Sequence, residues 1–152
     1  MSPYRPPGTP VFPTWKATLP IPRYTTNIVW QLGMSDLKLQ VVSHQTQAGL
    51  PYQHLHAQIV TPTGILTPAA LKSLAIPTGM IWSQGVVIEG KLPLWAAGYL
   101  VHACHTAAWV ATFDPRLGND TPQSGGAVVV ATHSPHVAEG DVLLLTIPDA
   151  VL

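Results

Sequence analysis

The chain has 152 residues, 47% of them hydrophobic and only 9% charged, and its seven Lys and Arg residues balance seven Asp and Glu residues. This length allows one well-buried core and is too short for two domains of ordinary size. Duplex DNA or a long RNA is disfavoured as a partner, because such polymers are held by many Lys and Arg contacts to phosphate. The composition is still compatible with a small ligand that carries a few phosphates. The single cysteine, Cys104, rules out an intramolecular disulfide framework and fits the reducing cytoplasm.

The composition divides the chain into a proline-rich N-terminal arm, residues 1–35, and a domain over residues 36–152. Proline fixes φ and removes amide donors, so residues 1–22 are expected to be extended and outside any sheet, and they lack the apolar helix of a signal peptide. Residues 92–113 contain no Asp, Glu, Lys or Arg and are long enough for a membrane span. They include His102 and His105 and then become β-rich, which favours a buried helix followed by a strand.

Alternating and β-branched segments predict six strands, and two proline-led segments predict helices. The two helices are expected over 68–74 and from Pro93 to about His105. The strands are expected to begin near Asp36 and to include residues 53–60 (a hairpin with the first), 85–90, 109–113, 127–131 and 142–147. This order indicates an α/β or α+β domain with one central β-sheet and two helices.

His102 and His105 are three residues apart on the second predicted helix, and therefore project from the same side. Such a pair can contribute to a divalent metal site, although further ligands are needed. The alternative is that one ring packs in the core and hydrogen-bonds a carbonyl group. His133 and His136 follow the strand over 127–131, where functional groups often project, but surface histidines are the ordinary explanation.

The turn Asp114-Pro115-Arg116 places an acid and a base directly after an apolar strand, and ligands of α/β sheets commonly bind beyond the carboxyl ends of strands. Asp114 can accept a proton or hold a metal, and the planar fork of Arg116 suits phosphate. The alternative is an Asp-Pro turn with a solvated or ion-paired arginine. About five strand residues, roughly 17 Å, separate His105 from Asp114. A catalytic site that used both would therefore imply an oligomer.

The segment from Gly90 to His105 (GKLPLWAAGYLVHACH), then Trp109 to Gly118 (WVATFDPRLG) and Ala127 to His133, resembles the third CRISPR ring nuclease family (Crn/Csx three). The likeness extends over about residues 50–147. It implies a small ferredoxin-like or Rossmann-like domain that forms homodimers, two of which enclose cyclic tetra-adenylate, the second messenger of type III CRISPR complexes in the prokaryotic cytoplasm. Family members linearise this ring with Mn²⁺ at a site shared between facing dimers.

By resemblance, the catalytic positions fall on His105, Asp114 and Arg116, with Asp114 a candidate Mn²⁺ ligand. Substrate-binding positions fall on Lys91, His102 and His133. The arm has no counterpart in the family, and residues 119–125 form an insertion directly after the Asp-Pro-Arg-Leu-Gly turn. Two other functions stay open: a non-catalytic sensor of cyclic oligoadenylate, and a Mn²⁺-dependent exonuclease acting on RNA 3′ ends.

Overall fold

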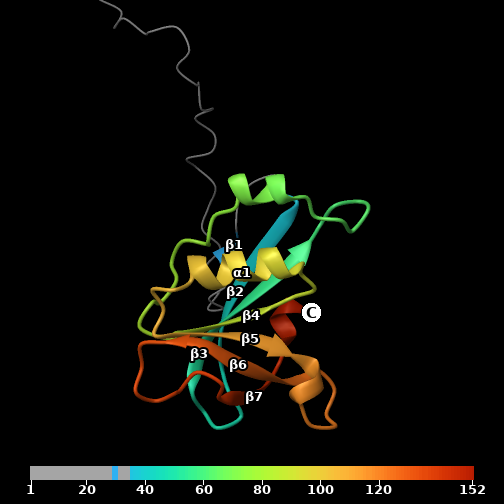
Figure 1. The fold of residues 1–152 in the computed structure, drawn as a ribbon. Coiled ribbons are helices and arrows are strands. Elements are labelled where there is room, and N and C mark those ends of the chain that lie inside the picture. The colour runs from blue at the N-terminus through green and yellow to red at the C-terminus, as the bar shows by residue number, and fades with distance from the viewer. Residues whose placement is uncertain (1–28, 31–34) are drawn as a thin grey trace, which may run out of the picture.

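The computed structural model describes residues 29–30 and 35–152, so the predicted arm lies outside the described residues except for Val29–Trp30. One seven-stranded sheet runs through the domain, with the strands in sequence order from β1 to β7 (Figure 1). The strands are β1 (Val29–Trp30), β2 (Leu37–Gln45), β3 (Pro51–Ile59), β4 (Gly85–Glu89), β5 (Trp109–Asp114), β6 (Ser124–Thr132) and β7 (Val142–Thr146).

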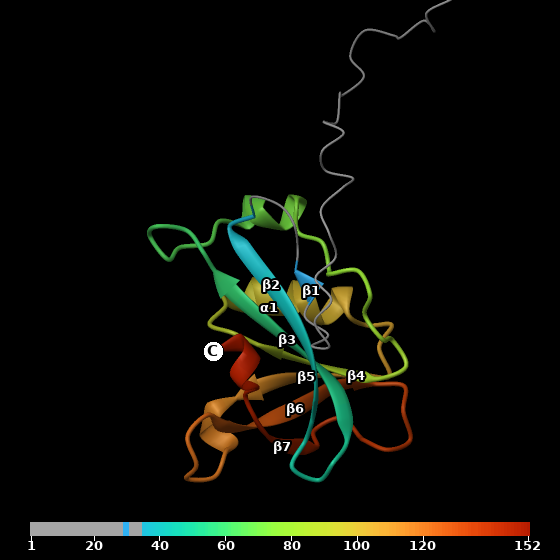
Figure 2. The same cartoon turned by 180° about the vertical axis from the view of Figure 1, so that it is seen from behind.

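The centre of the sheet is parallel and its flanks are antiparallel. β3, β4 and β5 run in the same direction, whereas β1, β2, β6 and β7 pair antiparallel with their neighbours (Figure 2). The carboxyl ends of β3, β4 and β5 therefore meet at one edge of the sheet, which we call the carboxyl edge. The opposite edge, where these three strands begin, is the amino edge.

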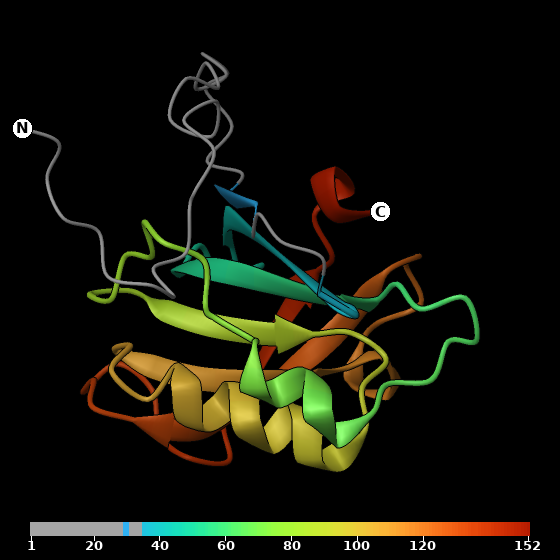
Figure 3. The ribbon, with the colours of Figure 1, turned by 90° about the horizontal axis from the view of Figure 1, so that it is seen from above.

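One face of the sheet is covered by the helix α1 (Leu94–Ala103) and by the short 3-10 helix η2 (Pro68–Lys72) (Figure 3). Alternation in the strands turns Leu39, Leu55 and Val86 toward Leu100 of α1, and all four side chains are fully buried. This cluster is the larger of two hydrophobic cores.

The second core lies on the other face, where Tyr52, Trp109, Val129 and Leu145 pack together. A C-terminal 3-10 helix, η4 (Asp149–Val151), lies over this face, and the carbonyl oxygen of Ala150 accepts a hydrogen bond from the side chain of Gln40 at 2.8 Å. The tip of the β2–β3 hairpin also bonds the last strand, from Gln47 N–H to the Leu144 carbonyl at 2.9 Å. These contacts curve the ends of the sheet toward each other.

The predicted fold class is confirmed: one small α/β (α+β) domain with a central sheet. The predicted hairpin, the strands after the arm and the helix after Pro93 are all present, but the segment after Pro68 forms a 3-10 helix of five residues. β1 comes from the residues assigned to the arm, and β6 begins at Ser124, inside the proposed insertion. No helix among the described residues is long and apolar enough to cross a membrane.

Candidate functional site

The residues singled out in the sequence lie at two opposite edges of the sheet. Asp114 is the last residue of β5, and Arg116 follows in the 3-10 helix η3 (Pro115–Leu117), so both stand at the carboxyl edge. His105 lies between α1 and β5, at the amino edge. His133 joins it there, because β6 runs antiparallel to β5 and ends beside Trp109.

Asp114 and Arg116 form an ion pair held by several hydrogen bonds. The Asp114 carboxylate accepts the backbone N–H of Arg116 at 2.9 Å and its guanidinium Nε and Nη2 groups at 3.0 and 2.7 Å. The Arg116 side chain is 87% exposed, so the guanidinium lies in solvent. The hydrogen bonds from Arg116 lower the pKa of Asp114 to about 2, and those to Asp114 raise the pKa of Arg116. The pair therefore presents an oriented cation at the end of the strand.

At the amino edge, His102 and His105 stack with ring centroids 5.4 Å apart and planes inclined by 15°. The Nδ1–H group of His105 donates to the His102 carbonyl at 2.8 Å. His133 reaches the same place, because its Nε2–H group donates to the His105 carbonyl at 3.0 Å. The His105 ring is thus held with Nδ1 protonated and Nε2 as its remaining nitrogen.

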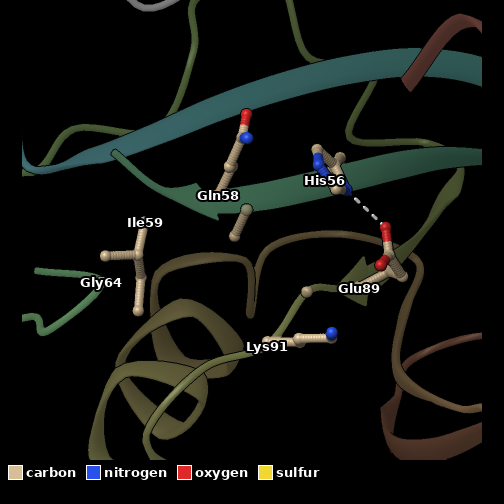
Figure 4. Close-up of a pocket in the computed structure, with 8 residues that line it drawn as sticks. His56, Gln58, Ile59, Gly64, Glu89 and Lys91 are labelled. Atoms are coloured by element: carbon tan, nitrogen blue, oxygen red, sulfur yellow. Dashed lines mark hydrogen bonds and ion pairs between the residues drawn. The ribbon is translucent and has the colours of Figure 1, made fainter. Parts of the chain in front are cut away.

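The structure brings His102, His105 and His133 together, and separately pairs Asp114 with Arg116. It does not bring the two groups together within one chain. Lys91, the remaining predicted residue, lies just beyond β4 and lines a pocket of about 360 Å³ at the carboxyl edge. In Figure 4, His56, Glu89 and Lys91 stand on one side of this pocket, and Ile59 and Gly64 on the other.

This pocket contains a cluster that the sequence analysis missed. Glu89 Oε2 accepts hydrogen bonds from His54 Nε2 at 3.2 Å and from His56 Nδ1 at 2.5 Å. The Tyr52 hydroxyl group lies 3.4 Å from the other ring nitrogen of His54, which extends the chain of contacts inward. A signal was present: if Leu55 and Ala57 face one core, then His54 and His56 share the other face of the strand.

The electrostatics of the cluster centre on the partly buried carboxylate of Glu89. Burial alone would raise the pKa of Glu89, but the hydrogen bonds from His54 and His56 outweigh it and lower the pKa to about 2. Burial lowers the pKa of His54, despite the opposing contact with Glu89. His54 is therefore neutral near pH 7, donating to Glu89 through Nε2–H and accepting from Tyr52 at Nδ1.

Gly90 allows the carboxyl end of β4 to lie against β3. Its φ is 150°, and a Cβ atom at this position would collide with the carbonyl oxygen of Ala57. The chain can therefore pass from Glu89 to Lys91 within the pocket only with a glycine between them.

No three His, Cys, Asp or Glu side chains in the described part of the chain are arranged to hold a metal ion. Around Glu89 the ring nitrogens bond the carboxylate directly, with no ion between them. Asp114 is the predicted Mn²⁺ ligand, and both of its oxygens are engaged by Arg116. The described part of the chain therefore does not offer Mn²⁺ a complete donor set.

The fold and site define a small α/β domain with polar groups at both ends of its central parallel strands. A family model described as "CRISPR-associated protein (Cas_csx3)" matches residues 59–144, more than half of the chain. The chain belongs to this family of CRISPR-associated proteins. It is also similar to an uncharacterized protein of Aquifex aeolicus (strain VF5), with 37% identity over 81 residues, or 51% of this chain and 67% of the relative.

Proposed function

We propose that the protein is a ring nuclease that linearises cyclic tetra-adenylate and so ends type III CRISPR signalling in the prokaryotic cytoplasm. Membership of the CRISPR-associated family supports this proposal at the level of the biological system. The side chains at the two edges of the sheet support it at the level of chemistry, because an oriented guanidinium and imidazole groups suit cleavage of a phosphodiester.

The observation that carries the proposal is the position of these groups at opposite ends of β5. His105 precedes this six-residue strand and Asp114 ends it. At about 3.3 Å per residue, the strand holds the two about 17 Å apart. A site that uses both is complete only when the amino edge of one copy faces the carboxyl edge of another. A cyclic, roughly symmetric ligand held between homodimers would meet this requirement, because symmetry repeats each contact.

In the proposed reaction, a ribose 2′-hydroxyl group attacks the neighbouring phosphorus atom. Arg116 stabilises the charge that develops on the phosphate oxygens, and Asp114 fixes the guanidinium in the orientation seen in the structure. His105 acts as general acid or general base through Nε2. Lys91, His102 and His133 hold the remaining phosphates and the bases of the ring.

Mn²⁺ stays part of the proposal as a cofactor bound where two copies meet, with Asp114 as one ligand. When bound there, the ion would neutralise phosphate charge. Binding would require the Asp114 carboxylate to give up part of its contact with Arg116. The requirement for Mn²⁺ is tested directly by comparing cleavage with Mn²⁺ and with a chelator.

The experiment is incubation of the purified protein with cyclic tetra-adenylate, with and without Mn²⁺, followed by mass spectrometry. We expect linear di- or tetra-adenylate, and we expect His105→Ala to abolish cleavage while the ring still binds. An intact ring that co-elutes with the protein would instead identify a sensor. Digestion of linear adenosine-rich RNA as readily as the ring would identify a 3′-end exonuclease. Unchanged turnover in His105→Ala would remove that residue from the mechanism.

A further inference from the structure

We propose that His56, oriented by Glu89, is the general base that takes the proton from the attacking 2′-hydroxyl group. This inference rests on the proposed ring nuclease function and assigns it a further catalytic residue. It follows from the geometry of the pocket at the carboxyl edge, where His56, Glu89 and Lys91 meet.

The hydrogen bond to Glu89 determines which nitrogen of His56 can act. Glu89 is an ionised acceptor, so His56 Nδ1, which lies 2.5 Å from Oε2, must carry the proton of a neutral ring. The lone pair then resides on Nε2, and a positive charge formed by protonation of Nε2 would be stabilised by the carboxylate. This is the arrangement by which a carboxylate orients a catalytic histidine in hydrolases.

His54 contacts the same carboxylate but is unsuited to this role. Its side chain is fully buried, and its two ring nitrogens face Glu89 and the Tyr52 hydroxyl group. The side chain of His56 is 21% exposed and lines the pocket. His54 therefore satisfies the buried end of the cluster, whereas His56 is the member that a ligand can touch.

The cluster lies at the same carboxyl edge of the sheet as Arg116, although side-chain alternation directs Glu89 toward the face of the second core and Asp114 toward the face that α1 covers. In the sheet, His56 of β3 is in register with Glu89 of β4, and Ile88 is in register with Thr112 of β5. β5 continues for two residues to Asp114, and β4 lies between β3 and β5, so the strands of His56 and Asp114 are two spacings, about 10 Å, apart. A phosphate held by Arg116 would have its ribose within the same edge, next to the pocket.

With this assignment, two histidines share the proton transfers of the cleavage step. The 2′-oxygen forms a bond to phosphorus while its proton passes to His56 Nε2, and the bond from phosphorus to the 5′-oxygen breaks. His105 of the facing copy, in its protonated form, gives its proton to the leaving 5′-oxygen. The product carries a 2′,3′-cyclic phosphate and a 5′-hydroxyl group, and no water, oxidant or reductant is consumed.

A substrate with a sulfur leaving group separates the two roles. In cyclic tetra-adenylate with bridging 5′-phosphorothiolate linkages, the thiolate departs without a general acid, but the 2′-hydroxyl group still needs a base. On the natural ring, both His56→Ala and His105→Ala should lower the single-turnover rate by about 10²- to 10⁴-fold. On the sulfur-bridged ring, His105→Ala should recover most of the rate and His56→Ala should not. His136→Ala, an exposed histidine in the connection between β6 and β7 that the proposed reaction does not use, is the matched control.

A second measurement requires no variant. Long-range ¹H–¹⁵N correlation spectra of the full chain should show neutral His56 protonated at Nδ1. Recovery of His56→Ala on the sulfur-bridged ring, full turnover of this variant on the natural ring, or protonation at Nε2 would each overturn the assignment. If circular dichroism shows that His56→Ala is misfolded, the protonation state of His56 in the wild-type protein decides whether the assignment holds. Wild-type protein that leaves the ring intact would instead refute the proposed function, and this inference with it.

Discussion

His105 and Asp114 lie at opposite ends of β5, so one short strand separates the histidine group from the acid–base pair. Extended backbone does not shorten appreciably, and the strand is hydrogen-bonded on both sides, to β4 and β6. Bringing His105 and Asp114 of the same chain into contact would therefore require the hydrogen bonds at the centre of the sheet to break. Any reaction that uses both groups needs two copies.

Replacing Arg116 with lysine tests the oriented guanidinium. Lysine keeps the charge but loses the two-point contact with Asp114 and the planar fork that matches phosphate. We expect Arg116→Lys to lower the single-turnover rate of ring cleavage at least tenfold, by analogy with loss of one donor to an oxyanion. The dissociation constant for the ring should change less than the rate. Equal cleavage by the variant and the wild type would show that only charge matters here.

Substitutions at Gly90 and Gly98 together test how closely β3 and β4 approach each other beside the pocket. Gly90→Ala should destabilise the fold by about 2 kcal/mol, because φ is 150° and the new Cβ atom would collide with the Ala57 carbonyl. Gly98 lies within α1, where a methyl group would project into open space, so Gly98→Ala should stabilise by up to about 1 kcal/mol. Urea unfolding checks both. Equal effects of the two substitutions would mean that β3 and β4 do not approach as described.

Stability should fall in acid, and in two stages. The pKa of His54 is lower in the folded state, so the unfolded chain takes up a proton more readily and stability is lost as the pH falls through the ordinary value of 6.5. The lowered pKa of Glu89 stabilises the fold above 4.5, and this contribution is lost as the pH falls toward about 2. Asp114 also has a lowered pKa, but its partner Arg116 is exposed to solvent, so screening leaves this pair a small contribution.

The free energy of unfolding, measured with urea from pH 7.5 to 3.5, checks this prediction. His54→Gln, which retains hydrogen-bonding groups but does not titrate, should flatten the change between pH 7 and 5 and leave the lower stage in place. An unchanged slope in that variant would show that a different group is responsible for the first stage.

Local patterns were sufficient to predict most of the elements. Alternation in residues 37–41 and 53–60 and the proline at 93 each led to the observed strand or helix, because one-sided burial imposes the period of its own structure. The segment after Pro68 was predicted as a helix and forms a 3-10 turn. The sequence shows that this segment is short, but whether its backbone hydrogen bonds follow the α or the 3-10 pattern depends on how it packs over the sheet.

The cluster around Glu89 was not predicted, although its residues were readable on the strands. His56 and Glu89 are 33 residues apart, and they meet only because β3 pairs with β4 in parallel and in this register. A single sequence does not reveal such pairing, since many registers satisfy the same alternation. In contrast, the separation of His105 from Asp114 could be predicted, because both flank one strand.

Mixing two inactive variants tests the shared site most directly. His105→Ala lacks the amino-edge histidine, and Arg116→Ala lacks the carboxyl-edge cation, so each alone should fail to cleave cyclic tetra-adenylate. When the two are mixed, a hybrid contact joins the intact His105 of one copy to the intact Arg116 of the other. We predict that the mixture regains a substantial part of wild-type cleavage, about a quarter if the copies associate at random. A mixture as inactive as its components, with both variants folded and binding the ring, would contradict a site built from two copies.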